Sequence, residues 1–147
     1  MRHINKLLMW TSVLLLLACG GTQKDAPKIE RQHYNSWEKD LGYSQVVRVG
    51  NTLYVSGMTA QGVTLESQMR AIYKSLQRVL DDYKISSASV VKEVIYTRDI
   101  EALKKANSIR LAFYSDDQYP SSSWLQVEQL FLKDFLVEIE FVLVVDG

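Results

Sequence analysis

Three consecutive serines, residues 121–123, lie between Pro120 and Trp124 in the segment YPSSSW. A serine hydroxyl becomes an effective nucleophile only when a general base lies within about 3 Å of it. Beyond the apolar N-terminal segment the sequence contains one histidine, His33, which falls in a polar stretch far from these serines. We therefore predict that the serines form a solvated loop and are not nucleophiles.

Two carboxylates in the last apolar segment are the second candidates for chemistry. Residues 137–141 read VEIEF, and the period of two in a strand places Glu138 and Glu140 on one face, opposite the apolar side chains. A carboxylate in an apolar strand is rarely fully buried without a partner. On this pattern both glutamates are candidates for a functional carboxylate.

The composition limits the class of protein. With 147 residues, 47% of them hydrophobic and 23% charged, the chain fits one globular domain. Lys and Arg number 17, as do Asp and Glu, and removal of an N-terminal signal with Arg2 and Lys6 leaves a net charge of about −2. No basic surplus is available for a nucleic-acid backbone, so we expect no nucleic-acid partner.

The N-terminus has the pattern of an export signal. A positively charged start and a short apolar run fill residues 1–18, and the sequence LLLACGG around Cys19 resembles the lipobox of bacterial lipoproteins. That resemblance implies a lipid anchor on Cys19 in the cell envelope; the alternative is a membrane anchor with an incidental cysteine. Gly20 is not the aspartate that retains enterobacterial lipoproteins at the inner membrane, so the outer membrane is favoured. We predict a polar tether up to residue 40.

The remaining chain, residues 41–147, alternates between strand and helix signals. Two apolar runs separated by Gly50-Asn51 predict a hairpin. An apolar stripe at residues 65–84 predicts an amphipathic helix, and a strand follows at residues 90–97. Asp99 can cap a second helix, and two strands are expected in residues 123–130 and 135–145.

The predicted order is β-β-α-β-α-β-β, an α+β domain with two helices on one face of a mixed sheet. Since the helices cover one face only, the other face must meet water or another subunit.

Three phrases of this sequence, GYSQVVRVGNTLYVSG, SVVKEVIYTRDIEALKKAN and VEIE, together resemble the RidA/YjgF family of reactive-intermediate deaminases over about residues 41–145. The resemblance implies a chorismate-mutase-like fold and a homotrimer with clefts between subunits. It also implies hydrolysis of enamines and imines to 2-keto acids and ammonia, with no metal and no cofactor. In the family an arginine in the cleft pairs with the substrate carboxylate, and a glutamate of the last strand positions water.

Only some of the family's functional positions hold the expected residue in this sequence. Glu138 falls on the last-strand glutamate, the catalytic candidate. Ser122 stands where the family has its arginine, and Trp124 occupies a position that is usually small. The ligand-binding positions implied by the resemblance are Tyr43, Ser56, Gly57, Asn107, Ser122 and Trp124.

Loss of the arginine leaves a cleft poorly suited to an anionic substrate, because the carboxylate of that substrate would face Glu138. Arg48, Arg98 or Arg110 could supply a cation from another direction, but we expect all three to be surface charges. Trp124 could fill the cleft, stack on a flat ligand, or pack in an interface.

Three functions remain open at this point. One is a lipid-anchored trimer that binds a small molecule without the usual deaminase activity. Another is an imine or enamine deaminase with altered specificity, in which Glu138 directs water. The third is an interaction module that displays a surface at the membrane. Ribonuclease activity finds little support in the acidic, exported chain.

Overall fold

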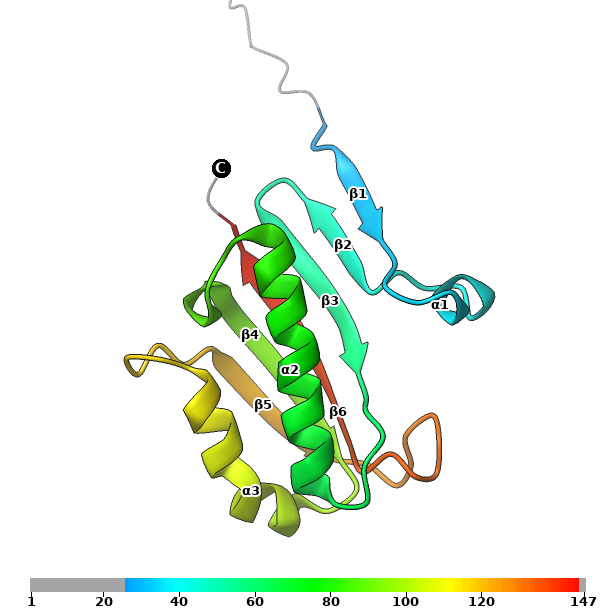
Figure 1. The fold of residues 1–147 in the computed structure, drawn as a ribbon, viewed down its shortest axis with the longest axis vertical. Helices are drawn as coiled ribbons and strands as arrows, with labels where there is room; N and C mark the ends of the chain where they lie inside the picture. The colour runs from blue at the N-terminus through cyan, green and yellow to red at the C-terminus, as the bar shows by residue number, and fades with distance from the viewer. Residues whose placement is uncertain (1–25, 146–147) are drawn as a thin grey trace, which may run out of the picture.

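The computed structural model describes residues 26–145, in which six strands form one mixed sheet (Figure 1). The strands are β1 (Ile29–Gln32), β2 (Val46–Val49), β3 (Thr52–Met58), β4 (Val90–Thr97), β5 (Ser121–Gln126) and β6 (Val137–Val144). Their order is β1-β2-β3-β6-β4-β5, and every neighbouring pair is antiparallel except β4 and β5. The last strand of the chain therefore lies inside the sheet, between β3 and β4.

Three α-helices accompany the sheet: α1 (Trp37–Asp40), α2 (Leu65–Tyr83) and α3 (Ile100–Phe113), with a 3₁₀ turn at Ser87–Ser89. The Thr64 side chain accepts a hydrogen bond from the Ser67 amide at the start of α2, and Lys84 ends that helix in a left-handed conformation. The Asp99 carboxylate accepts a hydrogen bond of 2.9 Å from the Ala102 amide. The predicted cap at Asp99 is therefore confirmed.

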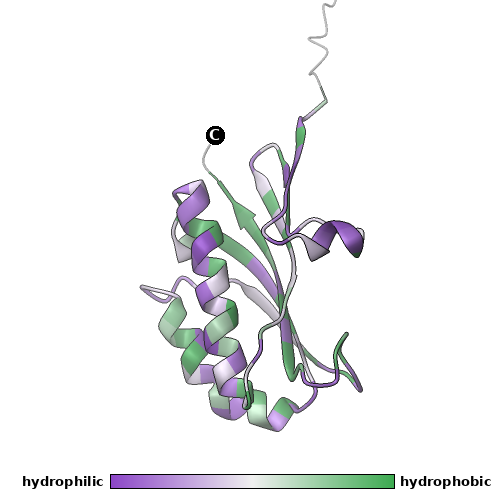
Figure 2. Ribbon diagram, turned by 45° about the vertical axis from the view of Figure 1, so that its right-hand side comes forward, coloured by the Kyte–Doolittle hydropathy of each residue, from purple (hydrophilic) through white to green (hydrophobic). Residues whose placement is uncertain are grey.

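The two long helices lie on the same side of the sheet (Figures 1 and 2). Their apolar sides pack on alternate strand residues, such as Val137, Ile139, Phe141 and Leu143 of β6, which are at most 2% exposed. The predicted α+β fold with two helices on one face of a mixed sheet is thus confirmed. Within the described residues the opposite face, called the open face below, is not covered by α2 or α3.

The predicted hairpin joins β2 and β3 through Gly50, whose φ of +59° is readily adopted by glycine. The tether prediction, in contrast, is wrong for residues 29–40. Strand β1 pairs with β2 from Ile29↔Val49 to Gln32↔Val46, and α1 follows it. Strand β1 is a four-residue edge strand whose side chains are mostly exposed, and backbone hydrogen bonds to β2 hold it in place. Its sequence therefore does not alternate between apolar and polar residues, which is the pattern that would have predicted a strand.

The predicted signal at residues 1–18 and the lipidation site Cys19 lie outside the described residues. No helix in the described part of the chain is long and apolar enough to cross a membrane.

Candidate functional site

The predicted site residues separate into two groups on different faces of the sheet. Glu138 is a half-buried residue of β6 whose neighbours Val137 and Ile139 face the helices, so its side chain lies on the open face. Ser122 pairs in register with Glu93 of β4, on the side that faces the helices. One copy of the chain therefore does not assemble the predicted site as a whole.

Glu138 forms one wall of a cavity of about 370 Å³ on the open face. The cavity is also lined by Leu41, Tyr43, Ser56, Gly57, Thr59, Phe131 and Phe135, and it is called the Glu138 pocket below. The pocket thus collects four of the predicted residues, namely Tyr43, Ser56, Gly57 and Glu138, and adds one threonine and three apolar residues.

Gly57 allows the carboxylate to lie against β3. A Cβ atom at this position would overlap the Glu138 carboxyl group, and the three nearest atoms to it all belong to the Glu138 side chain. The pairing of β3 with β6 also shifts register between Val55 and Met58, which brings Gly57 beside Glu138. Glycine is therefore required here because of a close approach.

The environment of Glu138 weakens its acidity. Burial raises its pKa above the ordinary value, and the nearby charge of Glu140 raises it further. Among the described residues that line the Glu138 pocket, none is Lys or Arg. A carboxyl group with these properties suits proton transfer or water positioning, because it can change charge closer to neutral pH.

A buried carboxylate holds the segment that carries Tyr43. Glu38 of α1 is 0% exposed, and its side chain accepts hydrogen bonds from the amides of Tyr34, Asn35 and Gln45. Its backbone carbonyl accepts from the Tyr43 amide at 2.9 Å. The short helix, expected to be part of a tether, therefore positions one wall of the Glu138 pocket.

Ser56 and Gln45 lock the same segment to β3. The Ser56 hydroxyl donates to the Ser44 carbonyl at 2.8 Å, and the Gln45 side chain donates to the Ser56 carbonyl at 2.9 Å. Ser56 thus uses its hydroxyl as a structural donor.

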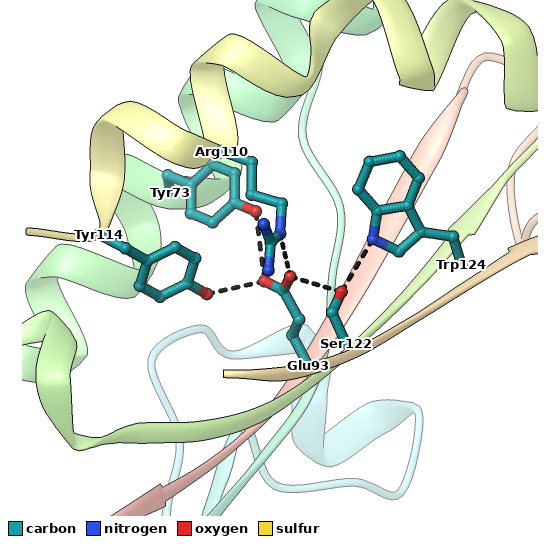
Figure 3. Close-up of polar contacts among 6 residues, drawn as sticks. All are labelled: Tyr73, Glu93, Arg110, Tyr114, Ser122 and Trp124. Atoms are coloured by element: carbon teal, nitrogen blue, oxygen red, sulfur yellow. Dashed lines mark hydrogen bonds and ion pairs between the residues drawn. The ribbon is translucent and has the colours of Figure 1, made fainter. Parts of the chain in front are cut away.

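The second group of residues surrounds Glu93, a carboxylate of β4 that is 0% exposed (Figure 3). Arg110 of α3 pairs with it through Nε, and the Tyr114 hydroxyl donates to it at 2.7 Å. Ser122 donates to Glu93 Oε1 at 2.7 Å, and the Trp124 indole donates to the Ser122 hydroxyl at 2.8 Å. A buried carboxylate is stable only with such partners.

The surrounding tyrosines remain hydrogen-bond donors. Burial, followed by the charge of Glu93, raises the pKa of both Tyr73 and Tyr114 well above the ordinary tyrosine value. Their hydroxyls therefore keep their protons over the whole physiological range.

Two predictions about this region are wrong. Ser121 and Ser122 are the first residues of strand β5, so the serines are not a loop; regular pairing with β4 overrides their weak strand preference. Arg110 is only 7% exposed and is not a surface charge, because its buried partner Glu93 compensates its burial.

The remaining arginines and Asn107 lie elsewhere. Arg48 donates to the Gly50 carbonyl at 2.9 Å, and Arg98 donates to the Lys133 carbonyl. Asn107 lies on α3, and its Oδ1 is buried with no hydrogen-bond partner among the described residues. Neither arginine lines the Glu138 pocket.

The nucleophile interpretation of the serines gains no support. Ser122 does have a carboxylate at 2.7 Å, but that carboxylate is paired with Arg110 and also accepts from Tyr114. A base whose charge is compensated in this way is poorly suited to remove a proton from a serine.

Sequence reasoning missed Glu93, Phe131 and Phe135. Glu93 could have been found from the sequence. In β4 it alternates with Ile95 and Thr97, so all three side chains point toward the helices. Arg110 lies among the apolar residues on the buried side of α3. A charge on each of two facing apolar surfaces indicates a buried pair. The two phenylalanines carry no such signal, since they lie in an irregular segment.

Comparison with known proteins agrees with this architecture. A family model described as endoribonuclease L-PSP matches residues 35–145, most of the chain. The chain belongs to the RidA/YjgF family. The family resemblance of the sequence is thereby confirmed.

Individual members of the RidA/YjgF family are distant relatives. A RutC family protein from Leuconostoc mesenteroides is 30% identical over 114 residues, which cover 69% of this chain and 87% of that protein. A protein from Dermatophagoides farinae named 2-iminobutanoate/2-iminopropanoate deaminase is 27% identical over 112 residues, covering 71% and 86%. The crystal structure of a YjgF-family member from Mycobacterium tuberculosis has a TM-score of 0.74 at 27% identity and covers 80% of this chain and 100% of that one.

Proposed function

We propose that this RidA-like protein binds a small molecule in clefts between copies of the chain and lacks the usual 2-imino acid deaminase activity. One observation carries the proposal: among its described lining residues the Glu138 pocket has no Lys or Arg, while Ser122 at the family's arginine position donates to buried Glu93. A carboxylate substrate would therefore meet a carboxylate without a cation to offset it.

The separation of the site residues supports assembly. Glu138, Tyr43 and Gly57 lie at the open face, whereas Asn107 and Ser122 lie on the helix side of the β5 edge. Family members are typically homotrimers, and a neighbouring copy whose β5 edge meets the open face would join the two groups. Export and a lipid anchor on Cys19, at the outer membrane, complete the proposal and rest on the N-terminal sequence alone.

A deaminase with altered specificity is the second candidate. The relative from Dermatophagoides farinae is named as a deaminase. In this chain Glu138 is half-buried, and its pKa is raised above the ordinary carboxyl value. In this alternative Glu138 positions water for attack on an imine or enamine that carries no carboxylate.

The proposal is tested by assaying the purified protein with 2-aminoacrylate generated in situ and following pyruvate release, with Glu138→Ala as the matched control. We expect equal rates for both proteins. A wild-type rate well above that of Glu138→Ala would overturn the proposal, because the usual deaminase activity would then persist without the family's arginine. Analytical ultracentrifugation tests the trimer, and loss of palmitate labelling in Cys19→Ser tests the anchor.

A further inference from the structure

We infer that the ligand of the Glu138 pocket is an organic cation, such as an amine, that carries an aromatic or bulky apolar substituent. This inference rests on the proposed function, because it names the class of ligand for the same pocket. It comes from a second cavity that adjoins the first.

The second cavity, called the outer cavity, has a volume of about 630 Å³. It shares Leu41, Tyr43, Thr59, Phe131 and Phe135 with the Glu138 pocket. Because the two cavities share these five walls, they adjoin each other, and a ligand that contacts Glu138 lies close enough to reach toward the outer cavity.

The outer cavity is bordered by apolar side chains that a globular protein normally hides. Trp37 and Leu41 of the α1 region are each 54% exposed, and Phe131 is 70% exposed. Neighbouring exposed groups of this size indicate a binding surface, whereas a single one does not. A phenyl or branched substituent that covers them gains about 25 cal/mol per Å² of apolar area removed from water.

The charges in this space favour a cation. Glu138 lies in the inner pocket and Asp40 lines the outer cavity, while none of the described lining residues of either cavity is Lys or Arg. The aromatic walls Trp37, Tyr43 and Phe131 add attraction, because the face of an aromatic ring binds ammonium groups. An anionic ligand would be repelled by both carboxylates.

The proposed assembly places a neighbouring copy beside this space, and the rival interpretation is that this copy covers the apolar border completely and leaves no room for a ligand. Burying that border in an interface would remove Asp40 and Glu138 from water without a cation among the described residues that line the two cavities, which is costly for carboxylates. A cationic ligand supplies the missing charge and the apolar cover together.

Calorimetric titration of the intact protein with four probes tests the inference. The probes are 2-phenylethylamine, ethylamine, 2-phenylethanol and 3-phenylpropionate, which separate the contribution of charge from that of the ring. We expect 2-phenylethylamine to bind about tenfold more tightly than either ethylamine or 2-phenylethanol, and 3-phenylpropionate to bind most weakly.

Variants assign each preference to its side chain. Glu138→Gln should reduce the preference for the amine over the alcohol, and Phe131→Ser should reduce the preference for the phenyl group over the ethyl group. Leu111→Ser, a change at an apolar residue of α3 that is 40% exposed, is the matched control and should alter neither.

Each unfavourable outcome has its own meaning. Tightest binding of 3-phenylpropionate, or equal binding of amine and alcohol, would overturn the cation inference and leave small-molecule binding standing. Failure of every probe to bind the folded protein would overturn the inference, whereas the proposed function is tested separately by the 2-aminoacrylate assay. Dissociation of the oligomer by Phe131→Ser with unchanged probe preference would assign the border to a subunit interface.

Discussion

Ser122 Oγ donates a hydrogen bond of 2.7 Å to Oε1 of Glu93, the same oxygen that pairs with Arg110 Nε. Ser122, at the family's arginine position, is thus one of the hydrogen-bond donors to the buried Glu93 carboxylate. The guanidinium that pairs with this carboxylate belongs to Arg110 of helix α3 (Figure 3). The fold keeps a cation at this edge of the sheet, but the cation is neutralised by Glu93.

Arg110→Met should lower the free energy of unfolding by about 3–5 kcal/mol, because it leaves the Glu93 charge buried without a cation. Adding Glu93→Gln to Arg110→Met should recover part of the loss, since the charge is then removed as well. Urea denaturation followed by circular dichroism measures both effects. Arg70→Met, at an exposed position of α2, is the control and should change stability by about 0.5 kcal/mol or less.

Ser122→Ala should destabilise the protein by about 1 kcal/mol, because Glu93 loses a donor and the Trp124 indole loses its acceptor. Ser123→Ala, which faces the opposite side of β5, should have little effect. Equal stability of the two variants in thermal denaturation would show that the Ser122 hydrogen bond contributes nothing measurable.

Gly57→Ala should displace the Glu138 carboxyl group, since the new methyl group would overlap it. We expect a loss of stability of about 1 kcal/mol and a marked loss of ligand binding. In a Glu138→Ala background the same glycine change should be nearly neutral, because the overlapping atoms are gone. An undiminished effect in that background would place the strain in the backbone of β3.

Glu138→Gln should stabilise the protein at about pH 7 and have no effect at about pH 4. Burial raises the pKa of Glu138 in the folded state, so ionisation is easier in the unfolded chain. Stability is therefore lost as the pH rises above the ordinary carboxyl value, and the amide escapes this loss. Chemical denaturation at the two pH values checks the prediction, with the exposed Glu128→Gln as control.

Glu38→Gln should lower stability by about 1.5–3 kcal/mol, because an amide replaces a buried carboxylate that accepts several amide N–H bonds. Hydrogen exchange should become faster at the amides of Tyr34, Asn35 and Gln45. If exchange at these amides stays slow while the free energy of unfolding falls, Glu38 does not hold the α1 segment in place and stabilises the fold in another way.

The sequence alone determined the layers of the fold. The period of 3.6 in α2 and the period of two in β6 are set by which side chains must leave water, so each helix and strand could be assigned from its own residues. Gly50 and Asp99 marked a turn and a cap through local backbone geometry. Glu138 was placed on the correct face for the same reason.

Only the tertiary structure decided the partners of the polar residues. Glu93 and Arg110 are far apart in the chain, and their pairing depends on α3 crossing over β4. Edge strand β1 is held by backbone bonds to β2, which leave no side-chain pattern. The meeting of Gly57 with Glu138 likewise follows from strand order, because β6, the last strand of the chain, pairs with β3.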